Sequence, residues 1–123
     1  MKYRELIKTV QQYSGFSDTE SKDALDGTVA TLAVHLTEGQ QENFASQLPT
    51  ELKDLALAVY ATEENSSQDL FEQFMEVQEV DESRAKKQLL SAWNALKDTL
   101  SSGLIDHIYS QLPTRTVKLL GAS

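Results

Sequence analysis

Apolar residues in the first half of the chain recur every three or four positions, the spacing of one face of an α-helix. They fall into four groups: Tyr3, Leu6, Ile7, Val10 and Tyr13; Leu25, Val29, Leu32 and Leu36; Phe44 and Leu48; and Leu52, Leu55, Ala56, Val59 and Tyr60. The polar residues lie between these positions. The pattern therefore predicts four amphipathic helices within residues 3–60.

Capping and turn residues separate these four groups. Gly15 follows the first group and is typical of a helix end. Ser17 with Glu20 three positions later has the spacing of a capping box, which predicts the start of a long helix. Thr37 is expected to cap a short third helix, and Pro49 fits the first turn of a fourth.

A polar, acidic stretch, "TEENSSQ" at 62–68, interrupts the pattern, which then begins again. The second set of stripes is Leu70, Phe71, Phe74 and Val77; Leu89, Trp93, Leu96 and Leu100; Ile105, Ile108 and Leu112; and Val117, Leu119 and Leu120. We therefore expect a linker at about 61–67 and four more helices within 68–121. The fold class is all-α, with about eight helices.

The two halves align without a gap when the chain is shifted by 64 positions. The matched pairs are mostly apolar: Leu6 with Leu70, Val10 with Phe74, Leu25 with Leu89, Val29 with Trp93, Leu32 with Leu96 and Leu36 with Leu100. Conserved core positions with diverged polar faces are typical of a duplicated structural unit. Two copies are too few for a solenoid, so we expect them to pack about a pseudo-two-fold axis as one compact domain over residues 1–123.

The pentapeptide "SQLPT" occurs at 46–50 and again at 110–114, at equal places in the two repeats. Each copy is predicted to be a structural joint between a short helix and the next one. Leucine anchors the short helix in the core, proline starts the next helix, and the glutamine amide bonds backbone groups at the corner. The joint residues are Gln47, Leu48, Pro49, Gln111, Leu112 and Pro113.

The run "DGTVATLAVHLTEGQQENFASQLPTELKDL" resembles the domain-of-unknown-function 2267 (DUF2267) family. The shared pattern is a long helix ending in L-x-x-x-L, a Ser/Thr-x-Gly turn, and a short helix closing on Q-L-P. "LSSGLIDHIYSQLPTRTVKLL" is similar to the second unit of this tandem family, and the resemblance covers roughly residues 3–120. Where the family often has arginine near the end of the long helix, this chain has His35. The resemblance implies a helical fold in a prokaryotic cytoplasmic protein, with no assigned activity.

Composition narrows the classes of function. The chain has no cysteine, which excludes disulfides, thiolate metal sites and cysteine nucleophiles. The charged N-terminus "MKYRELIKTVQQ" is unlike a signal peptide, and no apolar run approaches the ~20 residues of a membrane span, so we expect a cytoplasmic protein. A formal net charge of −8 disfavours binding to nucleic acids and to anionic membranes.

Residues for catalysis or metal binding are sparse. His35 and His107 occupy non-equivalent repeat positions, and Asp106 and His107, as helix neighbours, point about 100° apart. Neither histidine belongs to the Glu-x-x-His motif of helical carboxylate metal sites. We therefore expect no enzyme activity, cofactor or metal.

Two apolar groups in the second repeat are open to more than one interpretation. Leu104, Ile105, Ile108 and Tyr109 give the short helix more apolar surface than one face needs. They are either buried in the domain or exposed to a partner or a second copy. Phe71, Phe74 and Trp93 replace smaller residues of the first repeat. These either fill the space between the repeats or line an apolar pocket.

The function that these patterns favour is a non-catalytic interaction or scaffold module, which offers an acidic surface to another protein. The alternative is a protein that binds a small apolar ligand between the two repeats.

Overall fold

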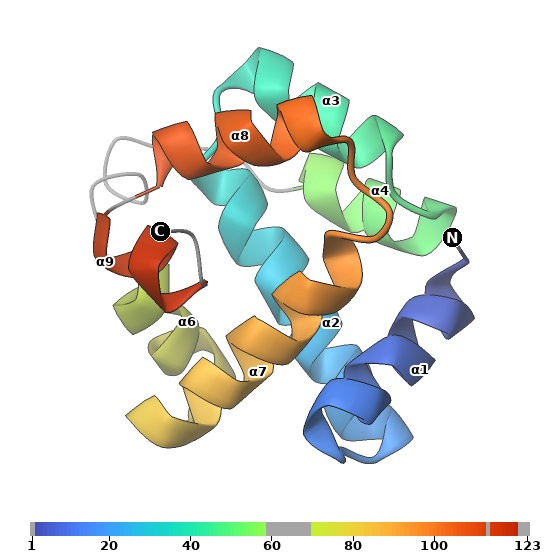
Figure 1. Ribbon diagram of the computed structural model, residues 1–123, viewed down its shortest axis with the longest axis vertical. Helices are drawn as coiled ribbons and strands as arrows, with labels where there is room; N and C mark the ends of the chain where they lie inside the picture. Colours follow the sequence, from blue (N-terminus) through green and yellow to red (C-terminus); the bar gives the residue numbers. More distant parts are fainter. Residues whose placement is uncertain (1, 59–69, 113, 121–123) are drawn as a thin grey trace.

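The computed structural model describes residues 2–58, 70–112 and 114–120, apart from the side chains of residues 38, 70, 71, 73, 77 and 115. Within these residues the chain forms eight helices and no strand, so the predicted all-α fold is confirmed (Figure 1). The helices are α1 (Tyr3–Ser14), α2 (Asp18–Val34), α3 (Glu38–Ser46), α4 (Thr50–Ala58), α6 (Leu70–Gln78), α7 (Glu82–Leu96), α8 (Ser102–Gln111) and α9 (Thr114–Leu119). The expected linker at 61–67 lies outside the described residues.

The capping residues predicted from the sequence lie at the ends of α1, α2 and α3. Ser17 Oγ accepts from the Glu20 N–H at 3.2 Å and Glu20 Oε1 accepts from the Ser17 N–H at 3.1 Å, a complete capping box at the start of α2. Gly15 ends α1 with φ of 76°, a left-handed conformation that glycine adopts easily. Thr37 is the N-cap of α3, but its side chain makes no capping bond in the described structure.

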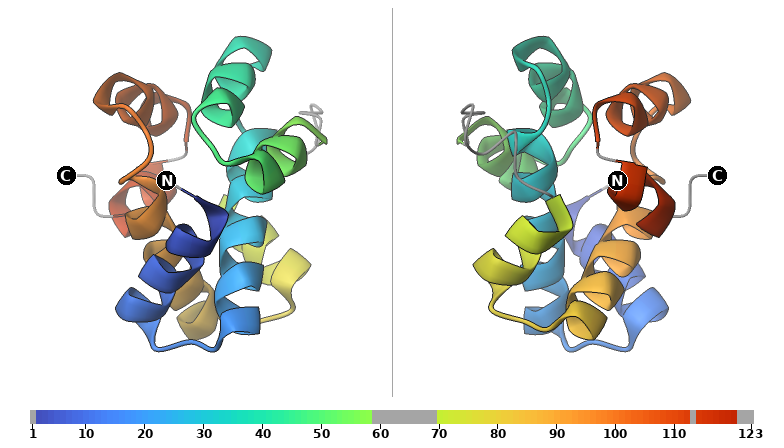
Figure 2. Two further views of the ribbon diagram at one scale, coloured as in Figure 1. Left: turned by 90° about the vertical axis from the view of Figure 1, so that its right-hand side faces the viewer. Right: turned by 90° about the vertical axis from the view of Figure 1, so that its left-hand side faces the viewer.

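Helices α2 and α7 form the centre of the fold. Figure 2 shows α1, α2, α6 and α7 gathered at one end and α3 with α8 at the other. Helix α1 packs on α2 and α7, and α6 packs on the same two helices. Their apolar side chains meet in one continuous core, and its largest fully buried members include Trp93, Phe44 and Phe74.

Contacts between the halves join equivalent elements. Helix α2 packs on α7 and α3 on α8, and the members of each pair occupy the same place in the two repeats. Helix α1 of the first half packs on α7, as α6 of the second half packs on α2. That the two repeats pack about a pseudo-two-fold axis stays a prediction.

Candidate functional site

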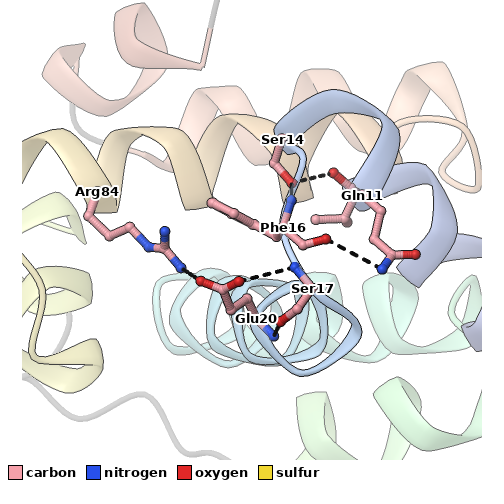
Figure 3. A network of polar contacts seen from close by, with 7 residues as sticks. Gln11, Ser14, Phe16, Ser17, Glu20 and Arg84 are labelled. Atoms are coloured by element: carbon pink, nitrogen blue, oxygen red, sulfur yellow. Dashed lines mark hydrogen bonds and ion pairs between the residues drawn. The ribbon is translucent and has the colours of Figure 1, made fainter.

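A network of polar contacts joins the α1–α2 turn to α7 (Figure 3). Its centre is an ion pair, in which Arg84 Nη2 lies 2.5 Å from Glu20 Oε2. These residues are 64 positions apart, so each occupies the other's place in the repeat. The Ser17 N–H, the Arg84 guanidinium and the Ser17 hydroxyl together lower the pKa of Glu20 from 4.5 to about 2. A carboxyl with so low a pKa is a weak proton acceptor, which indicates a structural role.

Phe16 supports this ion pair from the turn between α1 and α2. Its ring is 6% exposed, and the Arg84 Cζ atom lies 4.2 Å from the ring centroid, a cation–π contact. Ser14 Oγ accepts from the Phe16 N–H at 3.1 Å and donates to the Val10 carbonyl at 2.7 Å. Gln11 Nε2 donates to the Phe16 carbonyl at 3.4 Å. The network therefore fixes the turn against α7.

The two glutamines of the repeated pentapeptide bridge the halves reciprocally. Gln47 Oε1 accepts from the Ser101 N–H at 2.7 Å, and Gln111 Oε1 accepts from the Thr37 N–H at 3.1 Å. The glutamine amides do bond backbone groups, but at the N-cap of the short helix in the opposite half rather than at their own corner. Each joint therefore ties α3 and α8 together.

The leucines and prolines of the joints lie as follows. Leu48 and Leu112 are both buried in the core. Pro49 precedes α4 directly, and its carbonyl accepts from the Leu52 and Lys53 N–H groups, so it stands at the helix entry rather than within the first turn. Pro113 lies outside the described residues.

Helix α8 does not present the apolar surface that one interpretation of the sequence required. Leu104 is 2% exposed and Ile108 is 0% exposed, so the partner-surface expectation is wrong for both. Ile105 and Tyr109 are half-buried and pack against the same core. The physical reason is the position of α8 beside α3 at one end of the central helices, where its apolar side chains complete the core.

The apolar pocket that one of the two interpretations placed at Trp93 is filled by side chains. Trp93 and Phe74 are both 0% exposed. The Trp93 indole N–H donates to the Tyr109 hydroxyl at 3.0 Å, and the two rings meet edge to face with centroids 5.6 Å apart. Trp93 and Phe74 are core residues, which removes the support for a ligand site there. The side chain of Phe71 lies outside the described residues.

The remaining titratable residues with a shifted pKa form a pair between α1 and α2. The Tyr3 hydroxyl donates to Asp26 Oδ1 at 2.7 Å. Burial raises the pKa of both Tyr3 and Asp26. His35 is buried at the end of α2, whereas His107 is exposed on α8, so the fold does not combine them with this pair.

No three His, Cys, Asp or Glu side chains in the described part of the chain form a group that could hold a metal ion. None of the helices described here is long and apolar enough to cross a membrane.

The acidic run "DES" at 81–83, which the sequence alone indicates as solvated surface, lies at the turn between α6 and α7 together with two further acidic residues. Glu76, Glu79, Asp81 and Glu82 are all exposed there, and we call this group the acidic corner. Glu79 has φ of 53°, the one positive φ at a non-glycine residue in the described chain. The available signal was the 64-residue shift, which places Glu79 on Gly15.

Comparison with known families agrees with the resemblance seen in the sequence. The family model described as "Uncharacterized conserved protein (DUF2267)" matches residues 3–119. The chain belongs to this family. No curated protein and no solved structure matches the chain.

Proposed function

We propose that this member of the DUF2267 family is a non-catalytic interaction module that binds a basic surface of another protein through its acidic corner. The observation that carries the proposal is Glu79. A residue other than glycine in the left-handed region costs roughly 1–2 kcal/mol, and the equivalent position in the first repeat is Gly15. The second repeat thus has a carboxylate where glycine would be less strained, which supports a role for that charge.

The geometry of the acidic corner suits binding of a basic surface. Asp81 Oδ1 accepts from the Arg84 N–H at 2.8 Å and so caps α7. The exposed Glu76, Glu79 and Glu82 lie on either side of this cap, at the end of α6 and the start of α7. Four carboxylates within residues 76–82 attract cations and steer the approach of a positively charged partner. The net charge of −8 adds a field of the same sign.

The contacts that tie the halves together support a preorganised surface. The Glu20–Arg84 ion pair and the reciprocal bonds of Gln47 and Gln111 hold α7, α3 and α8 in place. A surface that needs no ordering on binding loses less conformational entropy. The shifted carboxyls, Glu20 and Asp26, are engaged with Arg84 and Tyr3, which favours structural roles for them.

The test uses a variant that combines Glu76→Gln, Glu79→Gly and Glu82→Gln. A partner is first captured by the wild-type chain and purified, and its affinity for each protein is then measured by titration at low and high salt. We expect the affinity of the variant for the partner to be at least about tenfold lower than that of the wild type. We also expect this affinity to fall less steeply as the salt concentration rises. Glu79→Gly alone should raise the free energy of unfolding by about 1 kcal/mol while weakening binding, because it removes both strain and charge.

A matched control removes three carboxylates elsewhere: Glu42→Gln, Asp98→Asn and Asp106→Asn, all at exposed positions. It has the same net charge as the acidic-corner variant. We expect the control to keep nearly wild-type affinity. Equal losses in the two variants, or no loss in either, would show that the acidic corner is not the binding surface.

A further inference from the structure

A hollow between α1 and α2 has an unusual lining for so acidic a protein. Its volume is about 180 Å³, and its lining residues are Arg4, Ile7, Lys8, Asp18, Thr19 and Lys22. We call it the basic hollow. The chain has 19 acidic and 11 basic residues, yet three of the six lining residues are basic and one is acidic. The local charge is therefore opposite in sign to the net charge.

The local fold explains how three cations meet there. Arg4 and Lys8 are four positions apart on α1, so they share one helical face. Bonds at two levels hold α2 beside α1: the Tyr3 hydroxyl donates to Asp26, and Gln11 Nε2 donates to Asp18 Oδ1 at 2.7 Å. These bonds bring Lys22 of α2 to the same hollow as the two α1 cations.

In the described residues the three cations have no ion-pair partner within 4 Å, although Lys22 interacts electrostatically with Asp26. The ion pair found there is that of Arg84 with Glu20, which does not involve the basic hollow. Asp18, the acidic lining residue, already accepts the bond from Gln11. Like charges held side by side raise the free energy of the folded state, and a bound anion would offset this cost.

We propose that the basic hollow binds a small phosphate monoester. Its phosphate lies among Arg4, Lys8 and Lys22, because a guanidinium and two ammonium groups match a doubly charged oxyanion. The Thr19 hydroxyl, in the first turn of α2, adds a hydrogen-bond donor to the lining. Ile7 offers an apolar contact for a short carbon skeleton.

The size of the hollow suits a small ligand. It is open to solvent on one side, and its volume of about 180 Å³ accommodates a phosphate with a few carbon atoms. The basic hollow shares no residue with the acidic corner, so this proposal does not depend on the proposed function.

The test is a titration of the full chain with glycerol 3-phosphate, inorganic phosphate and uncharged glycerol, followed by amide NMR. We expect shifts centred on Arg4, Lys8, Thr19 and Lys22 with glycerol 3-phosphate, weaker binding of inorganic phosphate, and none of glycerol. Shifts spread evenly over all lysines would overturn the proposal. Equal affinity for inorganic phosphate and the ester would overturn the assignment of the carbon skeleton to Ile7.

A variant pair separates this hollow from general surface charge. Lys8→Gln with Lys22→Gln removes two lining cations, and Lys86→Gln with Lys118→Gln removes two exposed cations from α7 and α9. Circular dichroism checks that both remain folded. We expect about tenfold weaker binding of glycerol 3-phosphate by the first variant and unchanged binding by the second. Unchanged affinity in the first variant would contradict the site.

Discussion

At the scale of single residues, Gly27 lies where α2 packs closely against α6. A Cβ built at Gly27 would lie 2.2 Å from Gln78 Nε2 and 3.4 Å from Phe74 Cε2. The first contact is with the far end of a flexible side chain, but the second is with a ring that is fully buried. By contrast, a Cβ at Gly103 in α8 would meet nothing within 4 Å. We therefore expect a larger side chain to change the free energy of unfolding in opposite directions at the two glycines.

Gly27→Val is expected to lower the free energy of unfolding by about 1–3 kcal/mol, because the Gln78 amide must move and the added methyl groups press on Phe74. Gly103→Ala is the matched control, and it should raise that free energy by about 0.5–1 kcal/mol through the helix preference of alanine. Urea unfolding measures both changes. A Gly27→Val protein as stable as the wild type would contradict the close packing of α2 on α6.

At the scale of elements, the sequence predicted where helices form better than it predicted which residues of other helices they contact. The stripe around Leu25, Val29 and Leu32 indicates α2 because side chains at helical spacing bury together whatever covers them. The partner of Gln47 could not be found this way, since its bond to Ser101 joins residues 54 positions apart. For Leu104, composition alone could not decide between a core and a surface position. The packing of α8 decided it.

The Glu20–Arg84 ion pair between α2 and α7 predicts a specific pH dependence. The pKa of Glu20 falls from 4.5 to about 2 on folding, so its charged form stabilises the folded state. This contribution is complete above pH 4.5 and is lost as the pH falls through about 2. The stability difference between wild type and Glu20→Gln should therefore be greatest at neutral pH and shrink as the pH falls below 4.5. Thermal unfolding from pH 7 to pH 2 measures it.

Arg84→Gln provides the control for this dependence. It removes one cause of the lowered pKa and leaves the bonds from Ser17. We expect Glu20→Gln made in the Arg84→Gln background to show a smaller loss at neutral pH than in the wild-type background. A difference that does not vary with pH would show that the Glu20 charge does not stabilise the fold.

At the scale of the whole molecule, contacts between equivalent residues offer a test of the predicted pseudo-two-fold relation between the halves. Under a two-fold rotation, a residue that touches its own equivalent must lie close to the axis. Glu20 and Arg84 are such a pair, at positions 64 apart. The bonds of Gln47 and Gln111 are exchanged by the same 64-residue shift. The 64-residue repeat could be found in the sequence. The bonds between equivalent positions of the two halves could be found only in the folded structure.

Exchanging the two charges tests this pseudo-two-fold arrangement. Glu20→Arg alone places two arginines together and removes the capping box of α2, so we expect it to lower the free energy of unfolding. Adding Arg84→Glu restores an ion pair and gives α7 a glutamate three positions after its N-cap, Asp81. If the halves are equivalent about this pair, the exchange moves the capping box from α2 to α7.

The double variant should therefore recover most of the stability lost by Glu20→Arg, and a double-mutant cycle in urea measures the recovery. Arg84→Glu alone, with two carboxylates side by side, completes the cycle and should also destabilise the fold. A double variant as unstable as the sum of the single ones would mean that the environments of positions 20 and 84 are not interchangeable. The shared 64-residue spacing would then reflect common ancestry of the halves without a symmetric contact between them.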